Sequence, residues 1–257
     1  MSKLPRSSRL ASPVDTGVHG EYRITRRPDD PRPLYRFSDH VSDDPEAGRY
    51  HLYAGWFCPW SQRVTIAHAL AGLEDVVSVS YIDNARDGRG WAFRERYGPD
   101  PVNGFTLLRQ AYEATEPGFD GHISVPTLWD RQTSRVLSND FTGIGIDFAT
   151  RFGHLAKPVV ETYPEHLRAE IEATDVKVEA TDEKLAALDE RIGDREHLVG
   201  GVLTEADIRV WVHLARLGPR IAEYPNLYRY ARALYQVPAF RDTTDFTTYA
   251  HPDWSLA

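Results

Sequence analysis

The segment from residue 49 to residue 72 constrains the fold of this chain most, because a buried strand leads through a tight turn into a helix. Residues 49–54 read Arg-Tyr-His-Leu-Tyr-Ala, which predicts a buried strand. Residues 62–70 carry apolar side chains at helical spacing, and Gly72 follows them. Because proline is tolerated at the first position of a helix, Pro59 suits that position and places Cys58 directly before it.

The patterns that follow complete a mixed α/β domain, which we assign to residues 49–155. The expected elements are a strand at 76–82, a helix at 105–112, strands at 123–130 and 135–137 joined by a polar turn, and a helix at about 140–152. The resulting order, βαβ(α)ββα, is that of a thioredoxin-like domain.

From about residue 156 to residue 257 we expect an all-α domain. Residues 165–191 are rich in Ala, Glu, Lys and Leu and predict a helix. Thr204 predicts the start of another helix, because its side chain can cap the backbone N–H of Asp207 while the Asp207 carboxylate reaches back. Residues 226–235 predict a further helix, which ends before the next proline.

Residues 1–48 form an N-terminal extension with several prolines, many charges and no sustained periodicity. Two interpretations stay open for this extension. It is either a disordered leader or a segment that wraps the core through Tyr22, Ile24, Tyr35 and Phe37.

Composition excludes several classes of function. Of the 257 residues, 41% are hydrophobic and 26% charged, as in ordinary globular proteins, and the net charge is −8 without a basic stripe. Binding to nucleic acid or to an anionic membrane is therefore disfavoured, and no apolar stretch is long enough to span a bilayer. The N-terminus has no secretory h-region. A single cysteine excludes an intramolecular disulfide and suits a reducing cytoplasm, and the ten histidines show no metal-ligand spacing.

The chemistry that the sequence predicts centres on Cys58 in the motif Cys-Pro-Trp-Ser. A lone cysteine is usually a small buried hydrophobe. At the N-terminus of a helix, however, unpaired N–H groups and the helix dipole stabilise a thiolate. Ser61 stands where a dithiol oxidoreductase carries its resolving cysteine, so an external thiol must release any mixed disulfide. We therefore predict a thiol-dependent enzyme with Cys58 as its nucleophile.

Two further features belong to the predicted site. Pro126 stands at the entry of a strand, where it cannot donate a ladder hydrogen bond, and a cis Val125–Pro126 bond explains that position. Such a bond turns the Val125 backbone outward to pair with a peptide-like thiol; the alternative is an ordinary edge-strand proline. Trp56 and Trp60 flank Cys58 and either line a pocket for an aromatic substrate or pack the α domain onto the first domain.

Seven ordered motifs resemble the glutathionyl-hydroquinone reductases, the Xi class of glutathione transferases. They are Gly48-Arg49-Tyr50-His51-Leu52-Tyr53, Cys58-Pro59-Trp60, Gly90-Trp91-Ala92-Phe93, Asp100-Pro101-Val102-Asn103-Gly104, Ser124-Val125-Pro126-Thr127-Leu128-Trp129-Asp130, Leu203-Thr204-Glu205-Ala206-Asp207-Ile208-Arg209 and Tyr224-Pro225-Asn226-Leu227.

The resemblance implies a homodimer in which a thioredoxin-like domain precedes a helical glutathione transferase C-terminal domain. It implies reductive cleavage of a thioether such as a glutathionyl-hydroquinone, with Cys58 attacking the sulfur and holding the thiol as a mixed disulfide. Trp91, Val125 and Pro126 are then expected at the bound thiol. No metal is implied; the co-substrate is a low-molecular-weight thiol.

The chain departs from the family where the thiol is recognised. The family typically has Glu-Ser-Ser, which grips the γ-glutamyl end of glutathione, where this chain has Asp140, Phe141 and Thr142. His122 stands near a position where the family often has an arginine. The helical domain is also shorter than the family's, and Tyr249 is the residue that loosely matches a substrate-binding tyrosine. Either glutathione is bound through altered contacts, or the co-substrate is another thiol such as mycothiol. From the sequence we favour the second alternative.

Two other functions compete with the reductase. Thiol conjugation is known on this scaffold, but those classes usually activate the thiol with Ser or Tyr rather than with a cysteine. A non-catalytic binding protein on the transferase scaffold is the other alternative.

Overall fold

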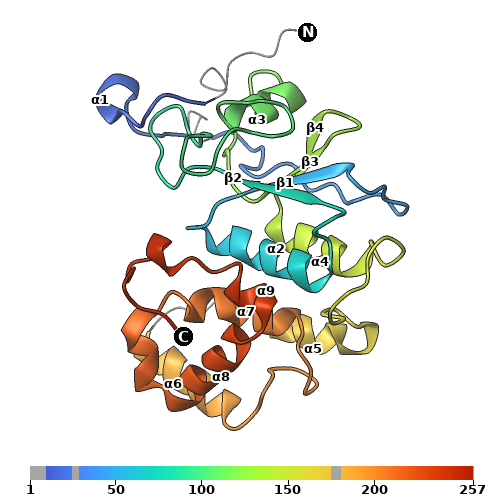
Figure 1. Ribbon diagram of the computed structural model, residues 1–257, viewed down its shortest axis with the longest axis vertical. Helices are drawn as coiled ribbons and strands as arrows, with labels where there is room; N and C mark the ends of the chain where they lie inside the picture. Colours follow the sequence, from blue (N-terminus) through green and yellow to red (C-terminus); the bar gives the residue numbers. More distant parts are fainter. Residues whose placement is uncertain (1–9, 25–28, 175–180, 257) are drawn as a thin grey trace.

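A mixed sheet of four strands forms the upper half of the molecule in the computed structural model, which describes residues 10–24, 29–174 and 181–256 (Figure 1). The strands lie in the order β2-β1-β3-β4 and span Tyr50–Ala54 (β1), Ser78–Tyr81 (β2), Thr127–Asp130 (β3) and Arg135–Ser138 (β4). β1 is parallel to β2 and antiparallel to β3, and β3 and β4 form the predicted antiparallel hairpin.

Helices cover both faces of this sheet. α2 (Pro59–Leu70) and α4 (Phe141–Thr150) pack against each other below it, and α3 (Arg109–Thr115) lies above it (Figure 1). β1 is buried on both faces because its side chains alternate: Leu52 belongs to the core beneath the sheet, whereas Tyr53 belongs to the core on the α3 side. The thioredoxin-like order predicted from the sequence is therefore confirmed.

The strand expected at 76–82 is shorter and spans Ser78–Tyr81, and the starts of two other elements were predicted too early. The helix expected at 105–112 begins at Arg109, because Leu107 forms a bridge with Ala92 and the Gln110 side chain accepts the N–H groups of residues 106 and 107. The strand expected at 123–130 begins at Thr127, after the proline that cannot join the ladder.

The lower half of the molecule is helical (Figure 1). Its elements are η2 (Glu165–Leu167), α5 (Arg168–Ala173), α6 (Asp182–Ile192), α7 (Glu205–Leu214), η3 (Gly218–Glu223), α8 (Pro225–Tyr235), α9 (Pro238–Arg241) and η4 (Phe246–Thr248). The single helix expected at 165–191 was wrong in extent: α5 ends before Thr174, and Thr181 caps α6 by accepting the Lys184 N–H. The part of that prediction at residues 175–180 lies outside the described residues. The predicted boundary at residue 155 falls between α4 and η2.

Helix α2 joins the two halves. Its residues Ile66, Ala67 and Leu70 lie in the same apolar cluster as Trp211 of α7. Beside this cluster a buried charge chain runs from Arg63 of α2 to Glu205 and Arg209 of α7. The capping box predicted at the start of α7 is present, and the Thr204 N–H donates to the Asp207 carboxylate over 2.7 Å. Helix α2, which carries Cys58 at its start, thus packs against both the sheet half and the helical half of the molecule.

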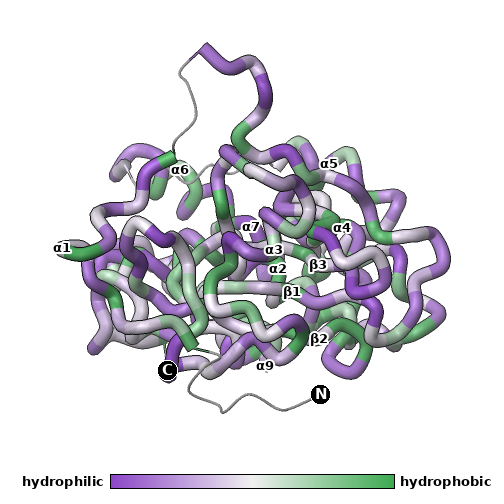
Figure 2. Tube along the Cα trace, turned by 90° about the horizontal axis from the view of Figure 1, so that it is seen from above, coloured by the Kyte–Doolittle hydropathy of each residue, from purple (hydrophilic) through white to green (hydrophobic). Residues whose placement is uncertain are grey.

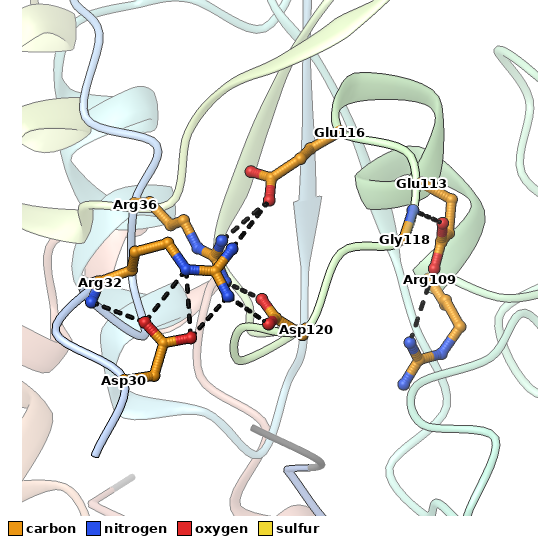
Figure 3. A network of polar contacts seen from close by, with 8 residues as sticks. All are labelled: Asp30, Arg32, Arg36, Arg109, Glu113, Glu116, Gly118 and Asp120. Carbon is orange, nitrogen blue, oxygen red and sulfur yellow. Dashed lines mark hydrogen bonds and ion pairs between the residues drawn. The ribbon is translucent and has the colours of Figure 1, made fainter. Parts of the chain in front are cut away.

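The described part of the N-terminal extension packs on the sheet half. Phe37 and Val41 are buried, and the Asn139 N–H donates to the Phe37 carbonyl over 2.8 Å. Arg32 and Arg36 form ion pairs with acidic residues at the end of α3 and in the loop after it (Figure 3). These contacts favour the wrapping interpretation for the described residues. Tyr35 and Ile24, which were expected to take part, are exposed by 57% and 39%, although Tyr35 also touches His122.

Hydrophobic and hydrophilic residues alternate in short stretches along the chain (Figure 2). None of the helices in the described part of the chain is both long enough and apolar enough to cross a membrane.

Candidate active site

Cys58 lies where β1 passes into α2. It is the N-cap residue of α2 with extended backbone angles (φ −88°, ψ 120°), and Pro59 occupies the first helical turn, as predicted. The side chain is buried, with 7% of its surface exposed, and its thiol donates to the Val125 carbonyl oxygen over 3.4 Å. Ser61 is also buried and accepts a hydrogen bond from the Gly55 N–H over 3.2 Å. Ser61 therefore braces the turn that presents Cys58.

A cavity of about 610 Å³ opens beside the cysteine. The residues lining it are Tyr35, Ser38, Phe57, Cys58, Trp60, Arg86, Trp91, His122, Ser124, Val125, Pro126, Asn139, Asp140 and Phe141. All of these come from the extension or the sheet half of the chain. Aromatic rings form much of the wall, and Phe57 packs on Trp91 with 4.8 Å between ring centroids. The cavity can take a flat aromatic group or the chain of a small thiol.

Val125 and Pro126 form one wall of the cavity. The peptide bond between these residues is cis, as expected. Over the described part of the chain, no hydrogen bond to the Val125 backbone N–H is recorded. Behind this wall the buried Tyr112 hydroxyl contacts the Ser124 carbonyl at 3.1 Å and the Thr127 hydroxyl at 2.9 Å. Val125 therefore lies on the cavity wall, on a firmly held support, with its backbone N–H unpaired among the described residues.

His122 lies on the wall of the cavity between two tyrosines. Its Nδ1 is 3.3 Å from the Tyr22 hydroxyl, and the Tyr35 ring meets it edge-on at 5.4 Å. Burial lowers the pKa of His122, and the positive charge of Arg86 lowers it further. The imidazole is therefore neutral at pH 7.

The start of α4 forms another part of the cavity. Asp140 is the N-cap of this helix, and its carboxylate accepts the Thr142 N–H over 3.0 Å. Phe141 stacks on Trp60 with 4.5 Å between centroids, and both line the cavity. Thr142 does not belong to the lining, because its backbone turns into the helix and serves the Asp140 cap.

Two more of the residues predicted for the site lie apart from the cavity lining. Trp56 stacks on Tyr81 at the sheet edge, 4.4 Å between centroids. Tyr249 lies in the helical half beneath Arg216, whose guanidinium carbon is 4.1 Å from the ring centroid. Burial raises the pKa of Tyr249 to about 12, so its hydroxyl keeps its proton.

Two arginines near the site were not predicted from the sequence. Arg86 lines the cavity next to Trp91. Arg216 follows the end of α7, and its guanidinium donates to the carbonyl of Phe57, the residue before Cys58, over 3.4 Å. Burial lowers the pKa of Arg216, against the opposing effects of Tyr249 and Cys58. Only the three-dimensional neighbourhood distinguishes these two among the many arginines of the chain. Within the described ranges, no cluster of three or more His, Cys, Asp or Glu side chains is arranged to hold a metal ion.

The thioredoxin-like sheet with its cis-proline and the helical half that follows define a glutathione transferase-type enzyme. A family model described as the glutathione S-transferase C-terminal domain matches residues 165–233. A solved Xi-class transferase from Phanerochaete chrysosporium aligns with a TM-score of 0.76 and 31% identity, covering 85% of this chain and 90% of its own.

Relatives with an assigned activity show to which family of glutathione transferases the chain belongs. Glutathionyl-hydroquinone reductase PcpF of Sphingobium chlorophenolicum is 36% identical over 221 residues, 72% of this chain and 71% of its own. The glutathione-bound structure of YqjG from Escherichia coli K-12 aligns with a TM-score of 0.72 and 31% identity, covering 80% of this chain and 79% of its own. The chain belongs to the glutathionyl-hydroquinone reductase family of Xi-class glutathione transferases.

Proposed function

We propose that this enzyme cleaves thioether conjugates of hydroquinone-type aromatics through a mixed disulfide on Cys58. The observation that carries the proposal is the position of the Cys58 sulfur, at the N-terminus of α2 and on the wall of an aromatic-lined cavity. Unpaired N–H groups at a helix N-terminus favour the thiolate, which is the attacking form. The family to which the chain belongs supports the same chemistry.

In the first step the Cys58 thiolate attacks the sulfur of the thioether. A sulfur–sulfur bond forms, the bond from sulfur to the aromatic carbon breaks, and its electron pair stays with the ring, which takes up a proton. In the second step an external thiolate attacks the mixed disulfide and releases Cys58. The sum is one thioether and one thiol consumed, and one hydroquinone and one disulfide formed. Because this chain has a single cysteine, the second thiol must come from solution.

The co-substrate is glutathione or another low-molecular-weight thiol such as mycothiol. Trp91, His122, Val125, Pro126, Asp140 and Phe141 all line the cavity and are the residues that would hold it. The Val125 N–H offers a backbone donor to a peptide-like thiol. The start of α4, with the Asp140 carboxylate, suits the amino end of such a molecule. Trp60 would face the aromatic group, while Trp56, Thr142 and Tyr249 would act only from outside the cavity lining.

We also propose a cytoplasmic homodimer. A nucleophilic thiol that is regenerated by a small thiol needs a compartment where thiols stay reduced. Dimerisation is an expectation carried by the family.

The test uses the single cysteine as its own reporter. Intact protein incubated with a glutathionyl-hydroquinone and no free thiol is expected to gain the mass of one thiol unit at Cys58 and to release the hydroquinone. Cys58→Ser should show neither change, whereas Ser61→Ala, which keeps the thiol and removes the acceptor of the Gly55 N–H, should still form the adduct. Conjugating activity that survives in Cys58→Ser, without an adduct on the wild type, would favour plain thiol transfer instead. A wild type without either activity would favour the non-catalytic scaffold.

A further inference from the structure

Arg86 is a cation of the cavity that makes no ion pair among the described residues. Its guanidinium carbon lies 4.3 Å from the centroid of the Tyr22 ring and 4.4 Å from that of Trp91. Within residues 10–24, 29–174 and 181–256, no carboxylate pairs with Arg86 and its side chain makes no hydrogen bond. Arg89 and Arg94, close by in the sequence, both pair with the Asp87 carboxylate. The N–H donors of Arg86 are therefore available to a ligand.

The surrounding structure fixes Arg86 in this place. The Asp87 carboxylate accepts the Asp15 N–H at 3.1 Å and the Arg89 N–H at 3.0 Å, and the Gly88 N–H donates to the Gly20 carbonyl at 2.7 Å. A side chain at Gly88 would collide with the His19 carbonyl, so this close approach of the extension requires glycine. The two aromatic faces then restrict the guanidinium group itself. A planar guanidinium held on aromatic faces keeps its N–H edges free for a carboxylate.

The cavity wall carries a negative charge at one place and a positive charge at another. Asp140 supplies a carboxylate at the start of α4, whereas Arg86 supplies the cation beside Trp91. His122 cannot take the role of that cation, because burial and Arg86 keep its pKa low and the ring neutral. A peptide thiol that pairs with Val125 and directs its amino end to Asp140 would bring its other end toward Arg86.

We infer that Arg86 binds the carboxylate at the glycine end of the thiol co-substrate. This inference rests on the proposed function of the cavity and makes it more specific. The co-substrate is then a carboxylate-bearing peptide thiol of the glutathione type. Mycothiol, a neutral sugar thiol without such a carboxylate, leaves the Arg86 charge unpaired.

Binding of two unreactive probes tests the inference. S-methylglutathione retains the glycine carboxylate, and its glycine ethyl ester lacks that charge. Each probe is titrated by calorimetry into the full-length wild type, Arg86→Gln and Arg86→Lys. The matched control is Arg109→Gln, which removes the same charge from a half-exposed arginine that pairs with Glu113 outside the cavity. Urea unfolding of each variant checks that the fold is retained.

Loss of a charge-assisted hydrogen-bonded pair in a partly desolvated site should weaken S-methylglutathione binding by about tenfold or more in Arg86→Gln. The ester should bind wild type and Arg86→Gln with affinities within about a factor of two, and Arg86→Lys should recover part of the loss, since it keeps the charge without the planar fork. Arg109→Gln should bind both probes as the wild type does.

Three results would overturn the inference: S-methylglutathione affinity unchanged in Arg86→Gln, an equal loss for both probes, or a folded wild type that does not bind S-methylglutathione. Binding is measured without turnover, so its outcome is separate from that of the Cys58 adduct test. A reductase that works with mycothiol and ignores S-methylglutathione would refute the role of Arg86 and leave the proposed reaction intact. S-methylglutathione binding that depends on Arg86, without any Cys58 adduct, would support the role of Arg86 and contradict the proposed reaction.

Discussion

Replacing Tyr112 with phenylalanine removes one hydroxyl that connects two walls of the cavity. The side chain is fully buried, and its oxygen contacts the Ser124 carbonyl at 3.1 Å, the Thr127 hydroxyl at 2.9 Å and the Asn139 amide nitrogen at 3.3 Å. Burial raises the pKa of Tyr112, so the hydroxyl keeps its proton and remains a donor. Ser124 and Asn139 both line the cavity. The substitution therefore tests whether a buried hydroxyl supports the site.

The expected loss of stability follows from the partners left behind. A buried polar group without its partner costs about 1–3 kcal/mol. The loss here should lie near the middle of that range, because the Thr127 hydroxyl keeps a second bond to the Ser124 carbonyl at 2.6 Å. We expect Tyr112→Phe to lower the free energy of unfolding by about 2 kcal/mol, or the melting temperature by roughly 4–8 °C for a chain of this length. The KM for the thiol should rise as the Val125 wall loosens.

Urea unfolding and thermal melting measure the first effect, and steady-state kinetics at varied thiol concentration measure the second. Tyr97→Phe is the matched control, because the Tyr97 hydroxyl has one part-buried contact, to the Asn84 side chain at 3.2 Å. Its loss should stay below about 1 kcal/mol. A Tyr112→Phe protein no less stable than Tyr97→Phe would refute the reasoning that the buried hydroxyl carries this network.

Three other predictions concern charge. Burial lowers the pKa of His51 to about 3, below its unfolded value near 6.5, so the unfolded state binds more protons and stability should fall by about 1.4 kcal/mol per pH unit below pH 6.5. Urea unfolding at pH 7 and pH 5 measures this loss, and an unchanged loss in His51→Gln would contradict it. Glu205→Gln leaves two arginines in the interface of α2 and α7 without their shared carboxylate and should cost about 3–5 kcal/mol, against less than about 1 kcal/mol for exposed Asp182→Asn in the same unfolding assay. Arg216→Met should slow alkylation of Cys58 by iodoacetamide, because it removes a half-buried cation whose guanidinium contacts the Phe57 carbonyl next to Cys58, while Arg216→Lys restores part of the rate; equal rates in all three proteins would exclude an influence of Arg216 on the thiol.

The order of elements could be predicted from the sequence wherever short-range patterns decide it. A run of mostly apolar residues marks β1 as a buried strand, and proline at the first turn marks the start of α2. The Thr204–Asp207 capping box marks the start of α7, because its hydrogen bonds join residues three positions apart. The start of α3 could not be predicted in this way, because a contact distant in sequence decides it. The pairing of Leu107 with Ala92 is such a contact, and it delays the start of α3.

The features of the site also fall into two groups: some are local in sequence, and others depend on the fold. Cys58, its place at the start of a helix and the cis bond before Pro126 are local features, and the sequence was sufficient to predict them. Arg86 was not predicted, because it joins the cavity only where residues 15–20 pack on its loop. Trp56, two residues before the cysteine, lies in the turn that the Cys58 N–H closes on the Gly55 carbonyl at 3.0 Å, and its ring stacks on Tyr81 instead of lining the cavity. The sequence alone thus determined the reacting group and its helix, through interactions within a few residues. The charges that surround the cavity depend on contacts between distant segments, and only the tertiary structure decided them.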